Sequence, residues 1–327
     1  MAYRFAVAKA NPSEINPATL SIGLLALLEK VSRRAGKGDV HRLRTTVRRL
    51  EVQLGTTPPK IAKSLKKLRK NAGKVRDLDV HLGLLEQPLL PRRGRHASDS
   101  PEARCQEKLR SFLQKKLDRE RIALRVRVKQ SAPLLEARLP DLVQRLSGPG
   151  VTLQEARQRA GRARRRFLQW TASIPEDEQR LHRLRIRTKK ERYLLEPLRN
   201  CQQAVEVAER FKQVQDAVGQ WHDWATLAEL AERCFNSSQD SSKGPSGAAS
   251  VLHALHARVG REYRRARRSA ESARRWMSGS RMTGSRPGKA SATAAGARGN
   301  PSLPARGTRA RPSVSAGTGP RLVGRAG

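Results

Sequence analysis

Residues 41–52 have the sequence HRLRTTVRRLEV, and residues 181–193 have the sequence LHRLRIRTKKERY. Both contain the pattern H-x-x-R-x-x-x-[RK]-[RK], which begins at His41 in the first stretch and at His182 in the second. A second match follows each copy in the same order, between LKKLRKNAGKVRDLDVHL at 65–82 and FKQVQDAVGQWHDWATL at 211–227. It aligns Gly73 with Gly219 and Asp77 with Asp223, which gives each copy a Gly-x-x-x-Asp element. Two matches in one order indicate an internal duplication with a repeat of about 140 residues.

Helix signals recur along the chain, whereas strand signals are almost absent. Capping and N-terminal proline patterns predict helix starts at Asn16-Pro17, Pro58-Pro59, Ser100-Pro101, Thr152 with Glu155, and Ser173 with Glu176. Glycine and proline interrupt the pattern at several points, including Gly73, which predicts about nine or ten helices. Apolar residues spaced three and four apart favour antiparallel packing. The sequence therefore predicts an all-α fold of two helical half-domains that face each other.

The composition is strongly basic, with 68 Lys and Arg against 29 Asp and Glu and a formal net charge of +39. Such a charge predicts a polyanionic partner. Hydrophobic residues make up 37% of the chain, enough for a sizeable core, while 4 Trp, 3 Tyr and 5 Phe are few for stacking on single-stranded bases. The 3 Cys share no C-x-x-C spacing, so neither a disulfide framework nor a zinc site is expected.

The chain divides into a helical body and a basic tail. We expect a helical domain over residues 1–277, with one half at about 15–146 and the other at about 151–277. Residues 278–327 are rich in Gly, Arg, Ser, Pro and Ala and contain no acidic residue, which predicts a disordered tail. The sequence has no apolar run long enough to span a membrane, and a cytoplasmic location is expected.

The repeated pattern places its cations on one side of a helix. At about 100° per residue, His41, Arg44 and Arg48 fall within about 60° of one another, with the leucine and valine residues opposite. His182, Arg185, Lys189 and Tyr193 share a face in the second copy, where the Tyr193 phenol adds a neutral donor. Two facing cationic stripes would repel each other, so their pairing predicts an anion between them.

These two basic helices, together with Arg76-Asp77-Leu78-Asp79, resemble the CHAD family, the conserved-histidine α-helical domains. The resemblance covers residues 15 to about 275, although His222 and Ala225 stand in the second copy where Arg76 and Asp79 stand in the first. It implies two pseudo-symmetric bundles whose facing basic helices line a central groove or pore that binds inorganic polyphosphate. It assigns binding to His41, Arg44, Arg48, Arg49, His182, Arg185, Lys189 and Lys190, and more loosely to Lys66, Lys67, Lys70, Lys74 and Lys212.

Other interpretations of the same residues stay open. A charged stripe can be only the solvated face of a helix, and the arginine runs at 157–166 and 258–275 are expected to be outer faces of this kind. Asp77, Asp79 and Asp223 are expected to form structural salt bridges rather than a metal site, and Trp221 and Trp224 to pack in the core. The histidines could instead accept a phosphoryl group.

The function predicted from the sequence is non-enzymatic binding of inorganic polyphosphate, with no cofactor and no metal. Nucleic-acid binding through the same basic surfaces is the alternative, and weak non-specific binding is expected in either case. A histidine phosphotransfer or polyphosphate-processing enzyme is the third hypothesis. Association with polyphosphate granules in the cytoplasm would follow from the first.

Overall fold

The computed structural model describes residues 16–86, 89–90, 100–146, 150–173, 177–236 and 247–279, which lie within one compact unit. These residues form eight helices and no strand, so the all-α prediction is confirmed. The helices are α2 (Pro17–Arg33), α3 (Lys37–Leu54), α4 (Pro59–Leu84), α5 (Pro101–Leu146), α6 (Leu153–Trp170), α7 (Glu178–Leu195), α8 (Gln202–Asn236) and α9 (Ala248–Gly279).

The predicted helix starts are confirmed with one exception. Asn16 caps α2 by accepting a hydrogen bond from the Thr19 backbone N–H at 2.9 Å, and Thr152 and Glu155 form a reciprocal capping box on α6. The start predicted from Ser173 is wrong, because Asp177 caps α7 by accepting from the Arg180 N–H at 2.6 Å. A carboxylate at the N-cap satisfies a free N–H and also interacts favourably with the positive end of the helix dipole.

Two other boundaries differ from the expectation. Gly73 does not interrupt a helix, since α4 continues through it without a break. Packing against the neighbouring α3 offsets the cost of about 1 kcal/mol that glycine imposes inside a helix. At the other end, α9 extends to Gly279. Its last two residues, Ser278 and Gly279, are therefore helical, although the prediction placed them in the tail. Residues 280–327, the remainder of the expected tail, lie outside the described residues.

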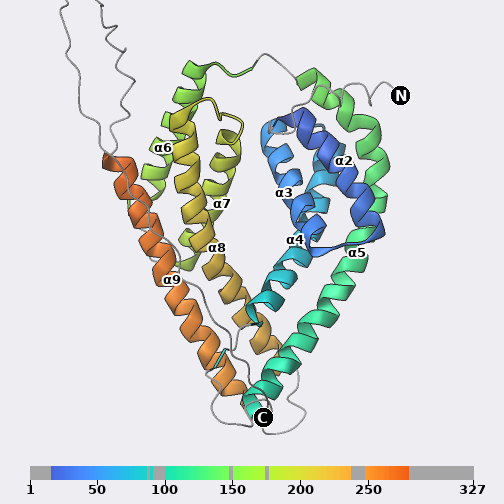
Figure 1. The fold of residues 1–327 in the computed structure, drawn as a ribbon, viewed down its shortest axis with the longest axis vertical. Helices are drawn as coiled ribbons and strands as arrows, with labels where there is room; N and C mark the ends of the chain where they lie inside the picture. Colours follow the sequence, from blue (N-terminus) through green and yellow to red (C-terminus); the bar gives the residue numbers. More distant parts are fainter. Residues whose placement is uncertain are drawn as a thin grey trace, which may run out of the picture. The chain divides into compact units, whose positions relative to one another are not determined.

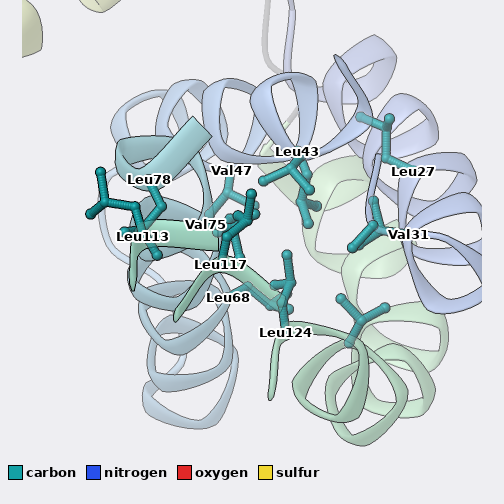
Figure 2. Close-up of a cluster of buried hydrophobic side chains, with 14 of the residues drawn as sticks. Leu27, Val31, Leu43, Val47, Leu68, Val75, Leu78, Leu113, Leu117 and Leu124 are labelled. Carbon is teal, nitrogen blue, oxygen red and sulfur yellow. The ribbon is translucent and has the colours of Figure 1, made fainter. Parts of the chain in front are cut away.

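Helices α2 to α5 enclose a core of leucine and valine side chains (Figure 2). Leu43 and Val47 of α3 are fully buried there, as are Leu68 of α4 and Leu113 of α5. Each buried leucine or valine side chain contributes roughly 1.5–3 kcal/mol relative to an exposed one. This core fixes the rotation of α3 about its axis, and therefore the direction in which its opposite, cationic face points.

A second core lies among α6 to α9 and contains Phe167 and Phe211, whose ring centroids are 5.4 Å apart. The two halves share part of their packing, because the end of α8 and the start of α9 pack into the first core. Trp224, Phe235 and Leu255 belong to that first cluster. Trp221 and Trp224 are both buried, as expected, although they lie in different cores.

Contacts between the halves also join α3 to α7 and α4 to α8. Figure 1 shows α2 to α5 grouped together beside α6 to α9, with α3 and α7 on the sides that adjoin. The two helices that carry the repeated basic motif therefore meet, and the two helices that carry the Gly-x-x-x-Asp elements meet as well.

Candidate functional site

The matched basic helices present their cations toward each other. Leu43, Val47 and Leu50 bury one side of α3, and Leu181, Leu184 and Leu195 bury one side of α7. The predicted separation of apolar and cationic faces is thus confirmed. His41, on α3, lies close enough to Lys189 of α7 for the Lys189 charge to act on its imidazole. The site therefore draws on both halves of the chain.

An arginine lies over a glycine in each half. A Cβ atom added at Gly73 would lie 3.4 Å from Arg44 Nε, and one added at Gly219 would lie 3.7 Å from Arg185 Nε. Arg44 Nη2 also lies 3.4 Å from Asp77 Oδ1, one turn beyond the glycine. The Gly-x-x-x-Asp spacing thus lets a guanidinium rest on the neighbouring helix, with a carboxylate nearby.

In the second half, Arg185 and Asp223 act on each other electrostatically. Burial raises the pKa of the Asp223 carboxyl, while the Arg185 charge opposes that shift. Burial also lowers the pKa of Arg185, and the Asp223 carboxylate opposes the change. The Nε atoms of Arg44 and Arg185 are both buried without a hydrogen-bond partner. Each guanidinium is therefore positioned by packing and charge rather than by a full set of hydrogen bonds.

Cations accumulate where α3 meets α7. Burial lowers the pKa of Lys189 to about 6, with further lowering by Arg48, Arg44, Arg185 and Arg192. Burial also lowers the pKa of Arg48 to about 10, assisted by the Arg44 charge. The positive charges of this cluster destabilise one another, and an anion placed among them would relieve that repulsion.

The motif histidines are held toward their neutral form. Burial lowers the pKa of His41, as do the charges of Arg76 and Arg44, and burial and Arg185 lower the pKa of His182. The His182 ring lies against that of His222, with centroids 4.9 Å apart. Burial lowers the pKa of His222 to about 4. A neutral imidazole can donate one hydrogen bond and accept another without adding charge to the site.

Arg49 differs from the other motif cations because it is paired across the halves. Its Nε donates to Glu196 Oε2 at 2.6 Å and its Nη2 to Glu196 Oε1 at 3.2 Å. Lys190, at the matching position of the second copy, is exposed.

Tyr193 shares the face of the motif cations, as predicted, and lies close enough to Arg48 and Arg185 to oppose the lowering of their pKa by burial. It is buried, and the Arg49 and Arg192 guanidinium groups lie over its ring. Arg49 and Tyr193 thus help to join α3 to α7.

The predicted lysines on α4 and α8 are exposed. Lys74 pairs with Glu120 of α5 at 3.1 Å, and Lys212 lies 3.7 Å from Glu209 of its own helix. Lys66 acts electrostatically on Glu51 of α3. The remaining members of this set are Lys67 and Lys70.

Asp79 has the structural pairing that the sequence predicted. Its Oδ1 lies 3.0 Å from Arg121 Nη2 of α5, and the carboxylate is almost fully buried. Burial raises its pKa, and Arg121 opposes the shift. Asp79 thereby ties α4 to α5, while Asp77 on the neighbouring face contacts Arg44.

Two further residues belong to this region but were not predicted. Arg192 follows Lys189 by one helical turn, bonds to Glu196 at 3.1 Å and contributes to the cationic cluster. Its spacing of seven from Arg185 could have revealed it. Buried His81 of α4 lies 3.0 Å from Thr226 Oγ1 of α8, a contact between the halves that no local pattern indicates.

Metal-binding clusters and membrane-spanning helices are both absent from the part of the chain that the structure describes. Among the described residues, no group of three or more His, Cys, Asp or Glu side chains could hold a metal ion. No helix in the same ranges combines the length and the apolar character needed to cross a membrane.

The chain is similar to known proteins in sequence and in fold. The CHAD domain family matches residues 24–232. The CHAD domain from the plant Ricinus communis has a similar structure, with a TM-score of 0.60 and 21% identity over 83% of this chain and 93% of that one. PptA from Streptomyces chartreusis is 18% identical, with a TM-score of 0.47, over 79% of this chain and 98% of that one. No curated protein matches the sequence.

Proposed function

The chain belongs to the CHAD domain family, and from that premise we propose that it binds inorganic polyphosphate where α3 meets α7. The meeting of the two copies of the basic motif carries the proposal. Arg44 and Arg48 of α3 lie within electrostatic reach of Lys189 on α7. A linear polyanion along this contact would interact with both copies at once.

Each residue type suits a different part of the ligand. Arginine offers paired N–H donors in a planar fork, so Arg44 and Arg185 can each contact two phosphoryl oxygens. Lys189 supplies a compact point charge once it takes up a proton. His41 and His182, neutral in the free protein, would shift toward the charged form beside an anion.

Charge compensation supplies the driving force. Two unit charges 4 Å apart interact with about 4 kcal/mol at the effective dielectric constant of a protein surface. Repulsion among Arg44, Arg48 and Arg185 is built into the free protein and helps to keep Lys189 neutral, and polyphosphate would convert this repulsion into attraction. Asp77 of α4 contacts Arg44, and Asp223 of α8 acts electrostatically on Arg185. These two carboxylates leave the cluster cationic.

We propose a binding role without catalysis, cofactor or metal, and a cytoplasmic location at polyphosphate granules. The histidine phosphotransfer alternative has less support, because His41 lies among cations of both basic helices and the His182 ring packs against that of His222.

A charge-matched pair of variants tests the proposal. The first replaces Arg44, Arg48, Arg185 and Lys189 with alanine. The second replaces exposed cations on the same two helices that point away from the cluster: Arg42, Arg180, Arg183 and Arg187. Binding of fluorescently labelled long-chain polyphosphate is measured at fixed salt, and helical content by circular dichroism.

The first variant should lose well over tenfold in affinity, because each charge-assisted hydrogen bond is worth about 1.5–3 kcal/mol. The second, which removes the same charge, should lose less than threefold. Equal losses in two folded variants would mean that polyphosphate responds only to net charge, and would remove α3 and α7 from the site.

A further inference from the structure

A second concentration of positive charge lies away from the α3 and α7 contact, beginning on α6. This helix carries six arginines and one acidic residue, Glu155. Glu155 is already engaged in the capping box with Thr152. Small alanines and Phe167 form the buried stripe of α6, so its arginines are left around the rest of the helix.

Helix α9 adds a row of exposed arginines. Arg261, Arg264, Arg268 and Arg275 are all exposed and lie within about 60° of one another around the helix axis. They extend over about 21 Å of helix length. Glu262 does not neutralise this row, because it is buried and lies 3.1 Å from Arg258. Glu271, the other acidic residue of α9, shares the face of the row, so four arginines lie there with one carboxylate.

The two helices pack together, although their arginine runs are about a hundred residues apart in the chain. Alanines line the packed sides of both, and Arg164 Nε donates to the Met277 carbonyl oxygen at 2.5 Å. Figure 1 shows α6 and α9 in the same half, and α9 contacts α5, α6 and α8. The α6–α9 surface comprises Arg157, Arg162, Arg165, Arg261, Arg264, Arg268 and Arg275. Over the described ranges, none of these seven forms an ion pair.

The surroundings restrict the kind of partner. The Trp276 ring is covered by Arg210 at 4.9 Å, and the Tyr263 ring packs on Trp221 at 5.8 Å. Neither ring is free to stack on an unpaired base, which single-strand binding uses. The apolar side of α9 is packed inside the protein, so it cannot enter a bilayer as an interfacial helix does.

A ligand for this surface must therefore be recognised by phosphate charge spread over a wide area. The grooves of a B-form duplex are about 6 Å and 12 Å wide, so a surface of about 21 Å can reach both backbones. A single polyphosphate strand would contact only one line of arginines. We propose that the α6–α9 surface binds duplex nucleic acid through its two phosphate backbones, independently of the polyphosphate site.

Charge-matched variants of the full chain separate a dedicated surface from diffuse charge. One variant replaces five arginines of the α6–α9 surface with glutamine: Arg162, Arg165, Arg261, Arg264 and Arg268. The control replaces five exposed, unpaired cations of α5 with glutamine: Arg104, Lys108, Lys115, Arg119 and Lys129. Each is titrated with a labelled 24-base-pair duplex, a single strand of equal length, long-chain polyphosphate and phosphatidylserine vesicles, over a series of salt concentrations.

The α6–α9 variant should bind the duplex more than tenfold less tightly, and its plot of log affinity against log salt should be less steep by about 3–4, since each phosphate contact contributes about 0.9. The α5 control should change by less than threefold. Polyphosphate affinity should stay within threefold in both, and the variant lacking Arg44, Arg48, Arg185 and Lys189 should keep its duplex binding.

Several results would overturn the inference. Equal losses of duplex affinity in the two variants would show that the charge is diffuse. Equal or tighter binding of the single strand would exclude recognition of two backbones, and binding to vesicles but not to the duplex would assign the surface to a membrane. Failure of polyphosphate binding alone would leave this inference standing, because it rests on other residues.

Discussion

Lys189 should make polyphosphate binding depend on pH. Its amine is buried among Arg48, Arg44, Arg185 and Arg192, and its pKa falls from 10.5 to about 6. At pH 7 about nine-tenths of these amines are therefore neutral. A polyanion placed beside the amine favours the charged form, so binding should be accompanied by proton uptake at this residue.

The magnitude follows from proton linkage. Between the pKa of the free protein and the higher pKa of the complex, affinity changes tenfold per pH unit for each proton taken up. From pH 7 to pH 9 the affinity should thus fall by roughly a hundredfold. The stability of the free protein should instead increase as pH rises. The unfolded chain holds more protons between about pH 6 and 10.5, so Lys189 makes unfolding harder as pH rises through that window.

Isothermal titration calorimetry at pH 7, 8 and 9 measures the affinity. Repeating it in buffers with different ionisation enthalpies counts the protons. Lys189→Met keeps the length of the side chain but removes the amine, and should flatten the pH dependence while lowering affinity most at pH 7. Lys190→Met is the matched control, because Lys190 is exposed on the same helix. It should keep the slope of the unaltered protein.

A flat affinity between pH 7 and 9 in the unaltered protein would refute the reasoning. The same conclusion would follow if Lys189→Met kept the full slope, since the proton would then belong to another group.

Two further changes test how the site is held together. Gly73→Leu should displace the Arg44 guanidinium that packs over it and lower polyphosphate affinity at least threefold. Gly83→Leu, in the same helix, places its side chain in open space and should leave affinity unchanged. Both affinities are measured by fluorescence titration, and equal values would contradict the packing role of Gly73. Glu196→Gln should lower the free energy of unfolding by roughly 1–3 kcal/mol because it breaks a largely buried ion pair between α3 and α7. Glu29→Gln, in an exposed pair, should change it by less than about 0.5 kcal/mol in the same urea titration.

Repetition made much of this fold predictable. The match of Gly73 to Gly219 and of Asp77 to Asp223 identified the elements that pack against the basic helices. Periodicity correctly assigned Leu43 and Val47 to the core. These features are local, or repeat at a fixed offset, and a sequence displays both directly.

The features that were missed depend on distant contacts. The sequence around Gly73 indicates a helix break, and only the folded structure shows that the Arg44 side chain packs over this glycine. Arg49 resembles every other cation of the motif until Glu196, far along the chain, pairs with it. The spacing of Tyr193 correctly placed it on the cationic face of α7, but its burial depends on the contact between the halves. No local pattern specifies such partners.

The packing of Trp224, Phe235 and Leu255 into the first core has a consequence for synthesis on the ribosome. Helices α2 to α5 are complete once residue 146 has emerged, but part of their apolar surface is covered only by side chains made about a hundred residues later. At 5–20 residues per second, the nascent chain waits on the order of 5–20 s with that surface open. The core of the first half therefore cannot be completed until the second half has been made. Chaperones that shield apolar surface should associate with the nascent chain during this interval.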